Sequence, residues 1–273
     1  MRRVFGGLGY YGVLVVVTLL ALGPTLWVMA SSLKTTGQIL SGGSLLPQPF
    51  TLEGYTTAFK EAELGRYLVN TLVYAIGGTL GALVTALLAA YPMARYDFRG
   101  RNTLVATFSL ALAIPVVGLA TPEFFVMREL GLFDRQYGMV IFYTALFFPL
   151  SFVILRAFLV SLPPELEEAA VVDGAGYFTI VRRIVVPLAR PALATVAVIV
   201  FVGIWNEFFF ANLLMASSEN QNAQMAIASF RTQFTFDVGA TVAAATVVML
   251  VPIGLFLVLQ RQVIAGLTAG TTK

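Results

Sequence analysis

The residue types that perform most enzymatic chemistry are missing from this chain. It contains no Cys and no His, which excludes disulfides, a Cys/His zinc site and a histidine general base. No Gly-Lys dipeptide occurs, so the chain lacks a phosphate-binding loop of the GxxxxGK[ST] type. Ser and Asp are present, but no polar trio falls within one apolar segment. We therefore predict a protein that is not an enzyme, with no catalytic residue, no metal site and no cofactor of its own.

One carboxylate stands inside a long apolar stretch. Glu207 directly follows Trp205 and Asn206, and an acid in such a stretch usually faces a bundle interior or a watery cavity. A carboxylate accepts hydrogen bonds from sugar hydroxyls, and an indole packs on the apolar face of a sugar ring. The trio is therefore a candidate part of a substrate pathway. The alternative is that Trp205 anchors a helix end at a membrane interface.

A second group of acids lies in a polar segment, residues 161–187. Ser161 precedes two Pro and three Glu, so we expect its hydroxyl to cap a helix whose acids favour the positive end of the helix dipole. That helix should run to Asp173, where Gly174 permits a left-handed stop. A second amphipathic segment, 177–186, follows, and Pro187 closes it. We predict a helix-turn-helix outside the membrane.

The composition indicates a membrane protein. Of 273 residues, 58% are hydrophobic and 11% charged, against about 25% charged in globular domains. A helix needs about 20 apolar residues to cross a membrane, and six segments qualify. They are residues 9–31, 67–91, 103–121, 137–160, 188–216 and 238–259. We predict an all-α integral membrane protein with six transmembrane helices in one domain, 1–273, that binds membrane lipid and no nucleic acid.

The basic residues predict the orientation. Six spans place both termini on one side, and with that side as the cytoplasm eleven of the 17 Lys and Arg residues lie in inner segments. An excess of Lys and Arg marks cytoplasmic loops. Both termini and the 161–187 segment, between the fourth and fifth spans, are therefore predicted to be cytoplasmic. In the second span, Gly77 and Gly81 have the GxxxG spacing that lets another helix approach closely.

The 161–187 segment also carries a motif with fixed spacing. The residues that form it are Glu168, Ala169, Ala170, Asp173, Gly174, Ala175, Val181, Ile184 and Pro187. This pattern resembles the EAA loop of bacterial ABC-importer permeases, whose usual Phe is replaced here by Val181. The resemblance implies that the segment is a coupling loop for a separate ATPase. It implies that Glu168 contacts that ATPase, that the Ala residues keep the helix narrow, and that Gly174 sets the turn.

Four other segments resemble the carbohydrate branch of the same permease family. They are residues 46–55, 91–101, 205–208 and 260–270. The last of these is similar to the C-terminal tail of the second permease subunit of maltose-type importers. Together the segments favour a sugar over an amino acid or a peptide as the transported solute.

The resemblance implies a transporter of several subunits in the bacterial inner membrane. Its other members are a second homologous permease, two ABC ATPase subunits that bind ATP and Mg²⁺, and an extracytoplasmic sugar-binding protein. Closure of the ATPases would drive alternating access of the spans. The alternatives are a secondary, ion-coupled transporter, an ABC permease for a non-sugar solute such as glycerol-phosphate, and a membrane-embedded enzyme. The sugar, and the choice between a homodimer and a heterodimer of permeases, stay open.

Overall fold

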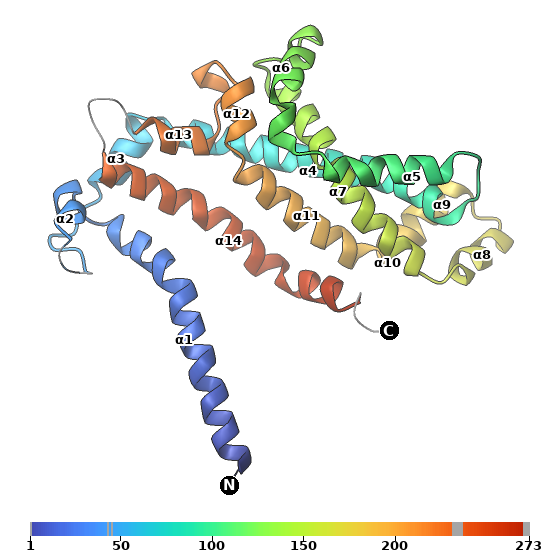
Figure 1. Ribbon diagram of the computed structural model, residues 1–273, viewed down its shortest axis with the longest axis horizontal. Coiled ribbons are helices and arrows are strands. Elements are labelled where there is room, and N and C mark those ends of the chain that lie inside the picture. The colour runs from blue at the N-terminus through green and yellow to red at the C-terminus, as the bar shows by residue number, and fades with distance from the viewer. Residues whose placement is uncertain (1, 43, 45, 231–236, 270–273) are drawn as a thin grey trace. The chain divides into compact units, whose positions relative to one another are not determined.

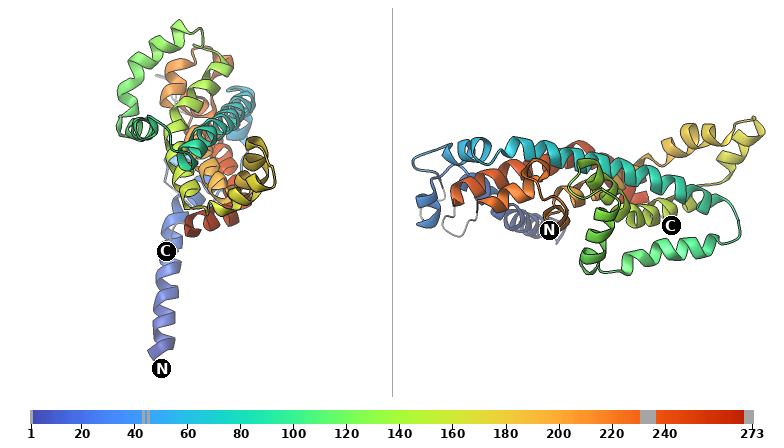
Figure 2. Two further views of the ribbon diagram at one scale, coloured as in Figure 1. Left: turned by 90° about the vertical axis from the view of Figure 1, so that its right-hand side faces the viewer. Right: turned by 90° about the horizontal axis from the view of Figure 1, so that it is seen from above.

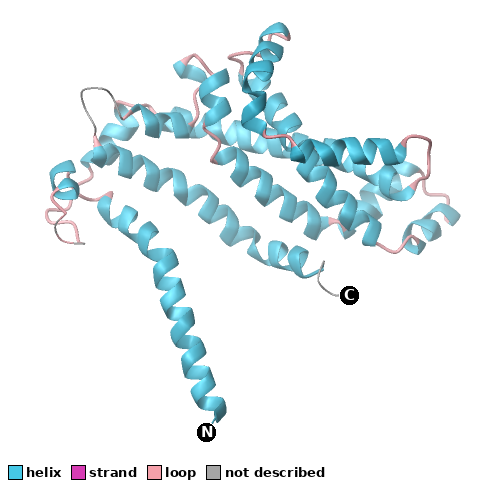
Figure 3. Ribbon diagram, in the orientation of Figure 1, coloured by secondary structure: helices cyan, strands magenta, loops and turns pink. Residues whose placement is uncertain are grey.

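A computed structural model describes residues 2–42, 44, 46–230 and 237–269 of the chain. Within these ranges every regular element is helical and no strand occurs (Figures 1 and 3). Four helices are long and apolar enough to cross a membrane, and two pairs of shorter helices reach that length when each bent pair is joined. The described residues therefore form an all-helical membrane protein with four to six spans.

The four long helices correspond to the first, second, fourth and sixth predicted spans. They are α1 (Arg2–Ser31), α4 (Leu64–Arg95), α7 (Gln136–Ser161) and α14 (Val238–Ala269). Each contains one proline, yet remains a single helix. Pro is tolerated in membrane helices because neighbouring groups satisfy the carbonyl that loses its amide partner.

The third predicted span, 103–121, is two helices set at an angle. Its first arm is α5 (Arg101–Leu110) with the short turn η1 (Ala111–Ala113). Its second arm is η2 (Val116–Leu119) with α6 (Ala120–Glu129), bent from the first by 97°. Pro115 has no amide hydrogen and drives the preceding Ile114 into an extended conformation (φ −79°, ψ 124°), which ends the first arm.

The fifth predicted span, 188–216, is also broken. Its approach consists of α9 (Tyr177–Ile180), the π-helical turn η3 (Val181–Val185) and α10 (Val186–Leu188). This arm meets α11 (Arg190–Trp205) at a bend of 74°. The bend lies between Pro187 and Pro191, which both lack an amide hydrogen. At the far end α11 stops at Trp205, and a separate helix, α12 (Phe209–Leu214), follows.

Five short elements complete the described structure. They are α2 (Thr36–Leu40), α3 (Glu53–Lys60), α8 (Glu165–Val172), η4 (Ser218–Asn220) and α13 (Ala223–Ser229). The chain divides into two compact units, Met1–Arg66 with Met225–Val251 and Tyr67–Gln224 with Pro252–Lys273.

In the first unit, polar groups and glycines fix the start of α14. The Asp237 carboxylate accepts hydrogen bonds from the Thr36 hydroxyl (3.1 Å) and from the Ala240 amide (2.9 Å). Gly54 of α3 lies so close to Gly239 that a Cβ at position 54 would sit 2.6 Å from the Gly239 carbonyl oxygen. The two backbones approach this closely because neither position carries a side chain.

In the second unit, α4 packs tightly against α7 and α11. A Cβ on Gly77 would lie 2.9 Å from a Val140 methyl group, and one on Gly81 would overlap the Thr144 hydroxyl. A Cβ on Gly78 would lie 2.7 Å from Ile204 of α11. The predicted close approach of another helix at the GxxxG face is therefore confirmed, and α7 is the helix that uses it.

We expect Gly81→Ala to destabilise the protein by about 1–3 kcal/mol, because the added methyl group overpacks the contact with Thr144. Thermal unfolding of the detergent-purified protein measures the effect. Gly254→Ala is the matched control, since nothing lies within 4 Å of a Cβ at that helical position. Adding Thr144→Ala to Gly81→Ala should restore much of the lost stability. Equal unfolding temperatures for the two single variants would contradict the packing described.

Candidate functional site

Two short helices, α8 and α9, are joined by a turn, and we call this unit, residues 165–180, the hairpin. Gly174 has the positive φ (+80°) expected at its stop. The Ala175 amide donates to the Ala170 carbonyl (2.9 Å) and the Gly174 amide to the Val171 carbonyl (3.0 Å). These two bonds define a Schellman turn, in which Gly satisfies the left-handed position. Gly174 and Ala175 therefore have a structural role at the turn.

The predicted cap of α8 by Ser161 is wrong. Ser161 is the last residue of α7, and its hydroxyl donates back to the Phe158 carbonyl (2.7 Å). Helix α8 starts after Pro164 without a side-chain cap, and Glu165, Glu167 and Glu168 occupy its first turn. The pair Pro163-Pro164 separates the hydroxyl from the new helix. The acids still lie near the positive end of the helix dipole.

In the right-hand view of Figure 2 the hairpin (yellow) projects at one end of α4. Four of the nine motif residues are exposed. The exposed motif residues are Glu168, Ala169, Asp173 and Gly174, whereas Ala170, Ala175, Val181, Ile184 and Pro187 are half-buried. Val172 is 87% exposed and Phe178 is 80% exposed, one on each side of the turn. Large apolar side chains left this open are typical of a surface that contacts another molecule.

A largely buried ion pair, which the sequence did not predict, attaches the hairpin to the end of α4. The Arg95 Nε donates to Glu167 Oε1 at 2.8 Å, and the Tyr91 hydroxyl donates to Glu167 Oε2 at 2.7 Å. The Arg95 and Glu167 side chains are only 11% and 13% exposed. Arg95 also donates to the Leu162 carbonyl (3.1 Å), and the Tyr91 ring lies 5.4 Å from the Tyr177 ring of α9. Sequence spacing does not reveal this contact, because 72 residues separate the two charges.

A cavity of about 430 Å³ adjoins this attachment. The residues that line it come from the end of α4 and from the hairpin: Tyr91, Arg95, Tyr96, Pro164, Glu167, Glu168, Val171, Val172 and Ile180. Glu168, the motif carboxylate, therefore shares one hollow surface with the exposed Val171 and Val172.

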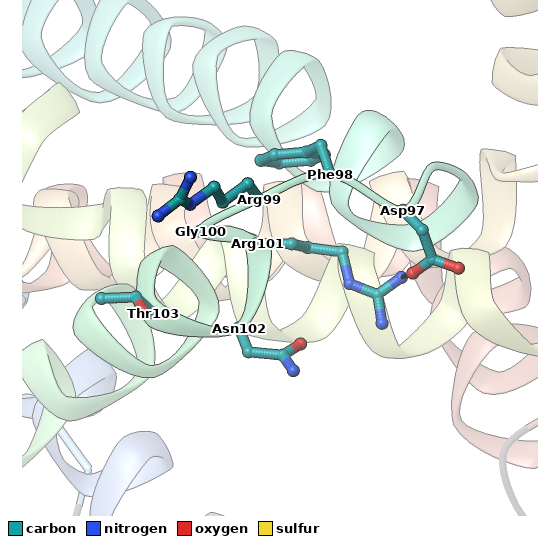
Figure 4. A pocket seen from close by; sticks show the side chains of 7 residues that line it. All are labelled: Asp97, Phe98, Arg99, Gly100, Arg101, Asn102 and Thr103. Atoms are coloured by element: carbon teal, nitrogen blue, oxygen red, sulfur yellow. Dashed lines mark hydrogen bonds and ion pairs between the residues drawn. The ribbon is translucent and has the colours of Figure 1, made fainter.

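The turn between α4 and α5 forms a separate hollow of about 420 Å³ (Figure 4). Arg101 forms an ion pair with Asp97 across the turn, and Gly100 takes the positive φ (+92°) that reverses the chain. Figure 4 shows the Arg99 side chain directed away from this pair. The contacts described here are local to the turn and shape the basic loop that the sequence placed between the second and third spans.

Glu207 is occupied by hydrogen bonds at the break after α11. Its carboxylate accepts from the Phe210 amide (2.8 Å), the Ala211 amide (3.0 Å) and the Tyr143 hydroxyl (2.8 Å). In a continuous helix those amides would bond to carbonyls one turn earlier. The side chain instead starts α12, while the Glu207 carbonyl accepts from the Asn222 amide group (2.7 Å). Glu207 therefore stabilises a break within the predicted span 188–216.

The other two residues of this predicted set lie in different environments. Trp205 is fully buried, and its ring stacks on Phe201 with a centroid separation of 5.6 Å and an angle of 14°. Asn206 is exposed and donates to the Val202 carbonyl of its own helix (3.0 Å). The structure therefore does not bring the three side chains together on one surface.

Polar side chains from α4 and α7 hold the segment after α12. Asn70 donates to the carbonyls of Glu219 (2.7 Å) and Gln221 (2.9 Å) and accepts from Gln136 (2.9 Å). The Tyr74 hydroxyl donates to the Asn220 carbonyl (2.6 Å). This polar cluster lies near the start of α4, whereas Arg95 and the hairpin lie at its end. It positions residues 219–223 at the end of the bundle opposite the hairpin.

Asp134, in the loop before α7, anchors the same segment. Its carboxylate accepts from the Ser217 amide (3.1 Å), the Ser217 hydroxyl and the Asn220 amide group (3.2 Å). Desolvation favours the neutral acid, but these hydrogen bonds to the charged form outweigh it and hold the pKa of Asp134 below its ordinary value. Asp134 also has a positive φ (+54°), which Asp tolerates better than most residues.

Comparison with known proteins assigns the chain to a family. Residues 82–268 match the family described as "Binding-protein-dependent transport system inner membrane component". The chain therefore belongs to this family, a class of multi-pass inner-membrane permeases, which confirms the family resemblance. Membership supports the importer subunit over the secondary-transporter and enzyme alternatives.

Individual relatives extend over almost the whole chain. It is 36% identical over 256 residues to the trehalose transport permease SugB of Mycobacterium tuberculosis, covering 93% of each protein. It is 30% identical over 265 residues to the diacetylchitobiose uptake permease NgcG of Streptomyces coelicolor, covering 96% of this chain and 88% of the relative. The fold matches a chain of a bacterial ABC transporter that imports the acidic polysaccharide alginate, with a TM-score of 0.79, 23% identity and 96% coverage of each chain.

One segment of the predicted resemblance is only partly described. The tail that resembles maltose-type permeases, 260–270, reaches Gly270, which lies outside the described residues together with 271–273. Residues 260–269 of this tail belong to α14.

We expect Glu207→Ala to destabilise the protein by about 1–3 kcal/mol, because two amides and the Tyr143 hydroxyl lose their acceptor. Asn206→Ala is the matched control, since that exposed side chain bonds only within its own helix. Thermal unfolding in detergent distinguishes the two variants. A Glu207→Ala variant as stable as the Asn206→Ala variant would show that the carboxylate does not support the break.

The stability that Asp134 contributes should depend on pH in a defined direction. Because its folded pKa is lowered, the contribution is full above the ordinary value of 3.8 and is lost as the pH falls through the folded pKa. The Asp134→Asn variant keeps the shape of the side chain but has no carboxyl group that titrates. We therefore expect the difference in unfolding temperature between wild type and variant to shrink below pH 3.8. A difference that is constant with pH would contradict the depressed pKa.

Proposed function

We propose that this chain is a permease subunit of an ATP-driven bacterial importer for a carbohydrate. The observation that carries the proposal is the hairpin, which presents Glu168, Val172 and Phe178 to solvent while a buried ion pair fixes it to α4. An exposed apolar element on a rigid support suits the docking of a second protein. The chain has no nucleotide-binding loop, so the ATPase that supplies energy is that second protein.

Sugar import is proposed from the relatives. Those already described are named for transport of trehalose and diacetylchitobiose, and a further one, MelC of Bacillus subtilis, for import of melibiose, raffinose and stachyose. These solutes are uncharged sugars of two or more rings. The proposed substrate class is therefore a di- or oligosaccharide, which we favour over a phosphorylated solute such as glycerol-phosphate.

The proposed topology has six spans with both termini in the cytoplasm. It counts the bent pair α5–η1 with η2–α6 as the third span and α11 with the segment that follows it as the fifth, so that α9 lies outside the spans. The hairpin then lies on the cytoplasmic side, together with the Arg95–Arg101 loop, as the excess of basic residues there requires. Broken spans are tolerated where protein groups satisfy the freed backbone, and Glu207 does so at the end of α11.

The proposed assembly contains a second homologous permease, two ATPase subunits that bind ATP and Mg²⁺, and an extracytoplasmic sugar-binding protein. Glu168 contacts the ATPase, while Ala169 and Ala170 let α8 enter its groove. Asp173, Gly174 and Ala175 hold the turn, and Val181, Ile184 and Pro187 support it from the next arm. In the substrate pathway Asn206 offers an exposed amide, and Trp205 and Glu207 act by fixing the backbone around it.

We expect Glu168→Arg to abolish transport and to leave less than about a tenth of the ATPase bound, because a misplaced charge at an interface costs several kcal/mol. The measurement is mild-detergent purification of the tagged chain from its own host, with mass spectrometry of the bound proteins. Glu165→Arg, on the same exposed helix start, is the matched control and should retain the ATPase. A wild-type chain that purifies folded but without an ATPase would overturn the proposed function.

A further inference from the structure

Along the chain, the hairpin is joined to α7 on one side and to α11 on the other. Neither connection is a continuous helix. On one side α7 ends at Ser161, and Leu162 is extended (φ −76°, ψ 135°) before α8 begins. On the other side the π-helical turn Val181–Val185 precedes the bend of 74° into α11. A helix that is broken or sharply bent transmits displacement along its axis poorly. Neither covalent connection is therefore a rigid path from the hairpin into the membrane.

The contact of the hairpin with α4 differs from these two connections, because it is largely buried and involves both α8 and α9. Glu167 of α8 bonds to Tyr91 and Arg95, and the Tyr91 ring packs on Tyr177 of α9. Tyr91 itself is 1% exposed. Arg95 additionally holds the Leu162 carbonyl, just before α8. We call Tyr91, Arg95 and Glu167 the clamp.

The clamp is poorly explained as a device for stability alone. Removing two charges from water largely cancels the gain from pairing them, and the Nη2 atom of Arg95 is buried without a hydrogen-bond partner. A buried ion pair is instead directional, and it is costly to break once formed. Those properties suit an attachment that must not slip when the hairpin is displaced.

Helix α4 continues from the clamp to the opposite end of the bundle. It is one helix of 32 residues, Leu64–Arg95. Near its other end, Asn70 and Tyr74 hold the carbonyls of residues 219–221, and Thr71 accepts the Ala223 amide at 2.8 Å. One unbroken helix thus connects the hairpin to the segment 219–223.

We propose that the clamp is a positioning device that makes α4 the transmitting element, so that displacement of the hairpin moves the segment 219–223. The inference rests on the proposed function, in which an ATPase displaces the hairpin. Tyr91, Arg95 and Glu167 are positioning residues, since they act through α4. The interrupted connections to α7 and α11 leave the hairpin free to follow the ATPase, and the clamp carries that motion to α4.

The test uses a cysteine reporter in the complete importer complex. The natural chain has no Cys, so Ser218→Cys places one exposed thiol beside the 219–223 segment. Its rate of labelling by a membrane-impermeant maleimide is measured without nucleotide and after trapping with Mg-ATP and vanadate. We expect trapping to change the rate about tenfold, a typical size for coupling between two sites.

In this reporter background, Arg95→Gln or Glu167→Gln should remove the rate change while the ATPase stays bound and hydrolyses ATP. The exchanged pair, Arg95→Glu with Glu167→Arg, should restore the change in labelling rate. Tyr91→Phe should reduce that change partly. Arg101→Gln is the matched control, because it breaks another arginine–carboxylate pair near the same end of α4 that does not touch the hairpin. Amounts of purified complex show whether each variant folds.

The outcomes separate the two proposals. If no ATPase accompanies the reporter chain, the proposed function fails. If the ATPase binds and trapping leaves the Ser218→Cys rate unchanged, or if the rate change persists in folded Arg95→Gln and Glu167→Gln variants, the clamp proposal is overturned. Loss of the response in Arg101→Gln would also overturn it, because the effect would then not be specific to the clamp. Should Arg95→Gln and Glu167→Gln both fail to fold, the other two variants test the clamp. An unreduced rate change in Tyr91→Phe, or no rate change in the folded exchanged variant, would then overturn the clamp proposal.

Discussion

The close approach of α4 to α7 and α11 is the constraint on which the second unit depends. Gly77, Gly78 and Gly81 leave no room for a side chain between α4 and its neighbours. Helices in lipid gain little from the hydrophobic effect when they associate, so close contact between their surfaces must supply the attraction. With α4 fixed in this way, polar residues at its two ends are held at definite positions. One end meets the hairpin, and the other meets the segment after α12.

The interruptions of the helices are as informative as the helices themselves. A backbone group without a partner is costly in an apolar environment, so each break needs a compensating contact. At the end of α11 the Glu207 carboxylate caps two amides of α12, and Asn222 satisfies the Glu207 carbonyl. A carboxylate first interpreted as a feature of a substrate pathway is thus a local architectural element. The break places exposed Asn206 at the end of α11.

The hairpin shows how a short motif becomes a rigid surface. The Schellman turn at Gly174 fixes the angle between its arms, and the attachment of Glu167 to Arg95 and Tyr91 fixes the pair to the bundle. The neighbouring Glu168, one residue later in the helix, remains exposed. Adjacent carboxylates on α8 therefore have different environments, because successive residues on a helix face about 100° apart. One binds within the chain, and the other is available to a partner.

Sequence patterns alone determined the helical membrane class, four of the long helices, the close contact at Gly77 and Gly81, the stop at Gly174 and the permease family. The structural features follow from local composition, from periodicity or from fixed spacing, and the family follows from the resemblance of the 161–187 motif. The tertiary structure decided what local patterns do not contain: the bends at Pro115 and Ala189, the end of α11 at Trp205, the failure of Ser161 to cap α8, and the pairing of Arg95 with Glu167. Local prolines permit the two bends and separate Ser161 from α8, but a sequence pattern does not give the angle of a bend. The end of α11 and the Arg95–Glu167 pair depend on distant groups, such as Tyr143 and Tyr91, that only the packed bundle brings within reach.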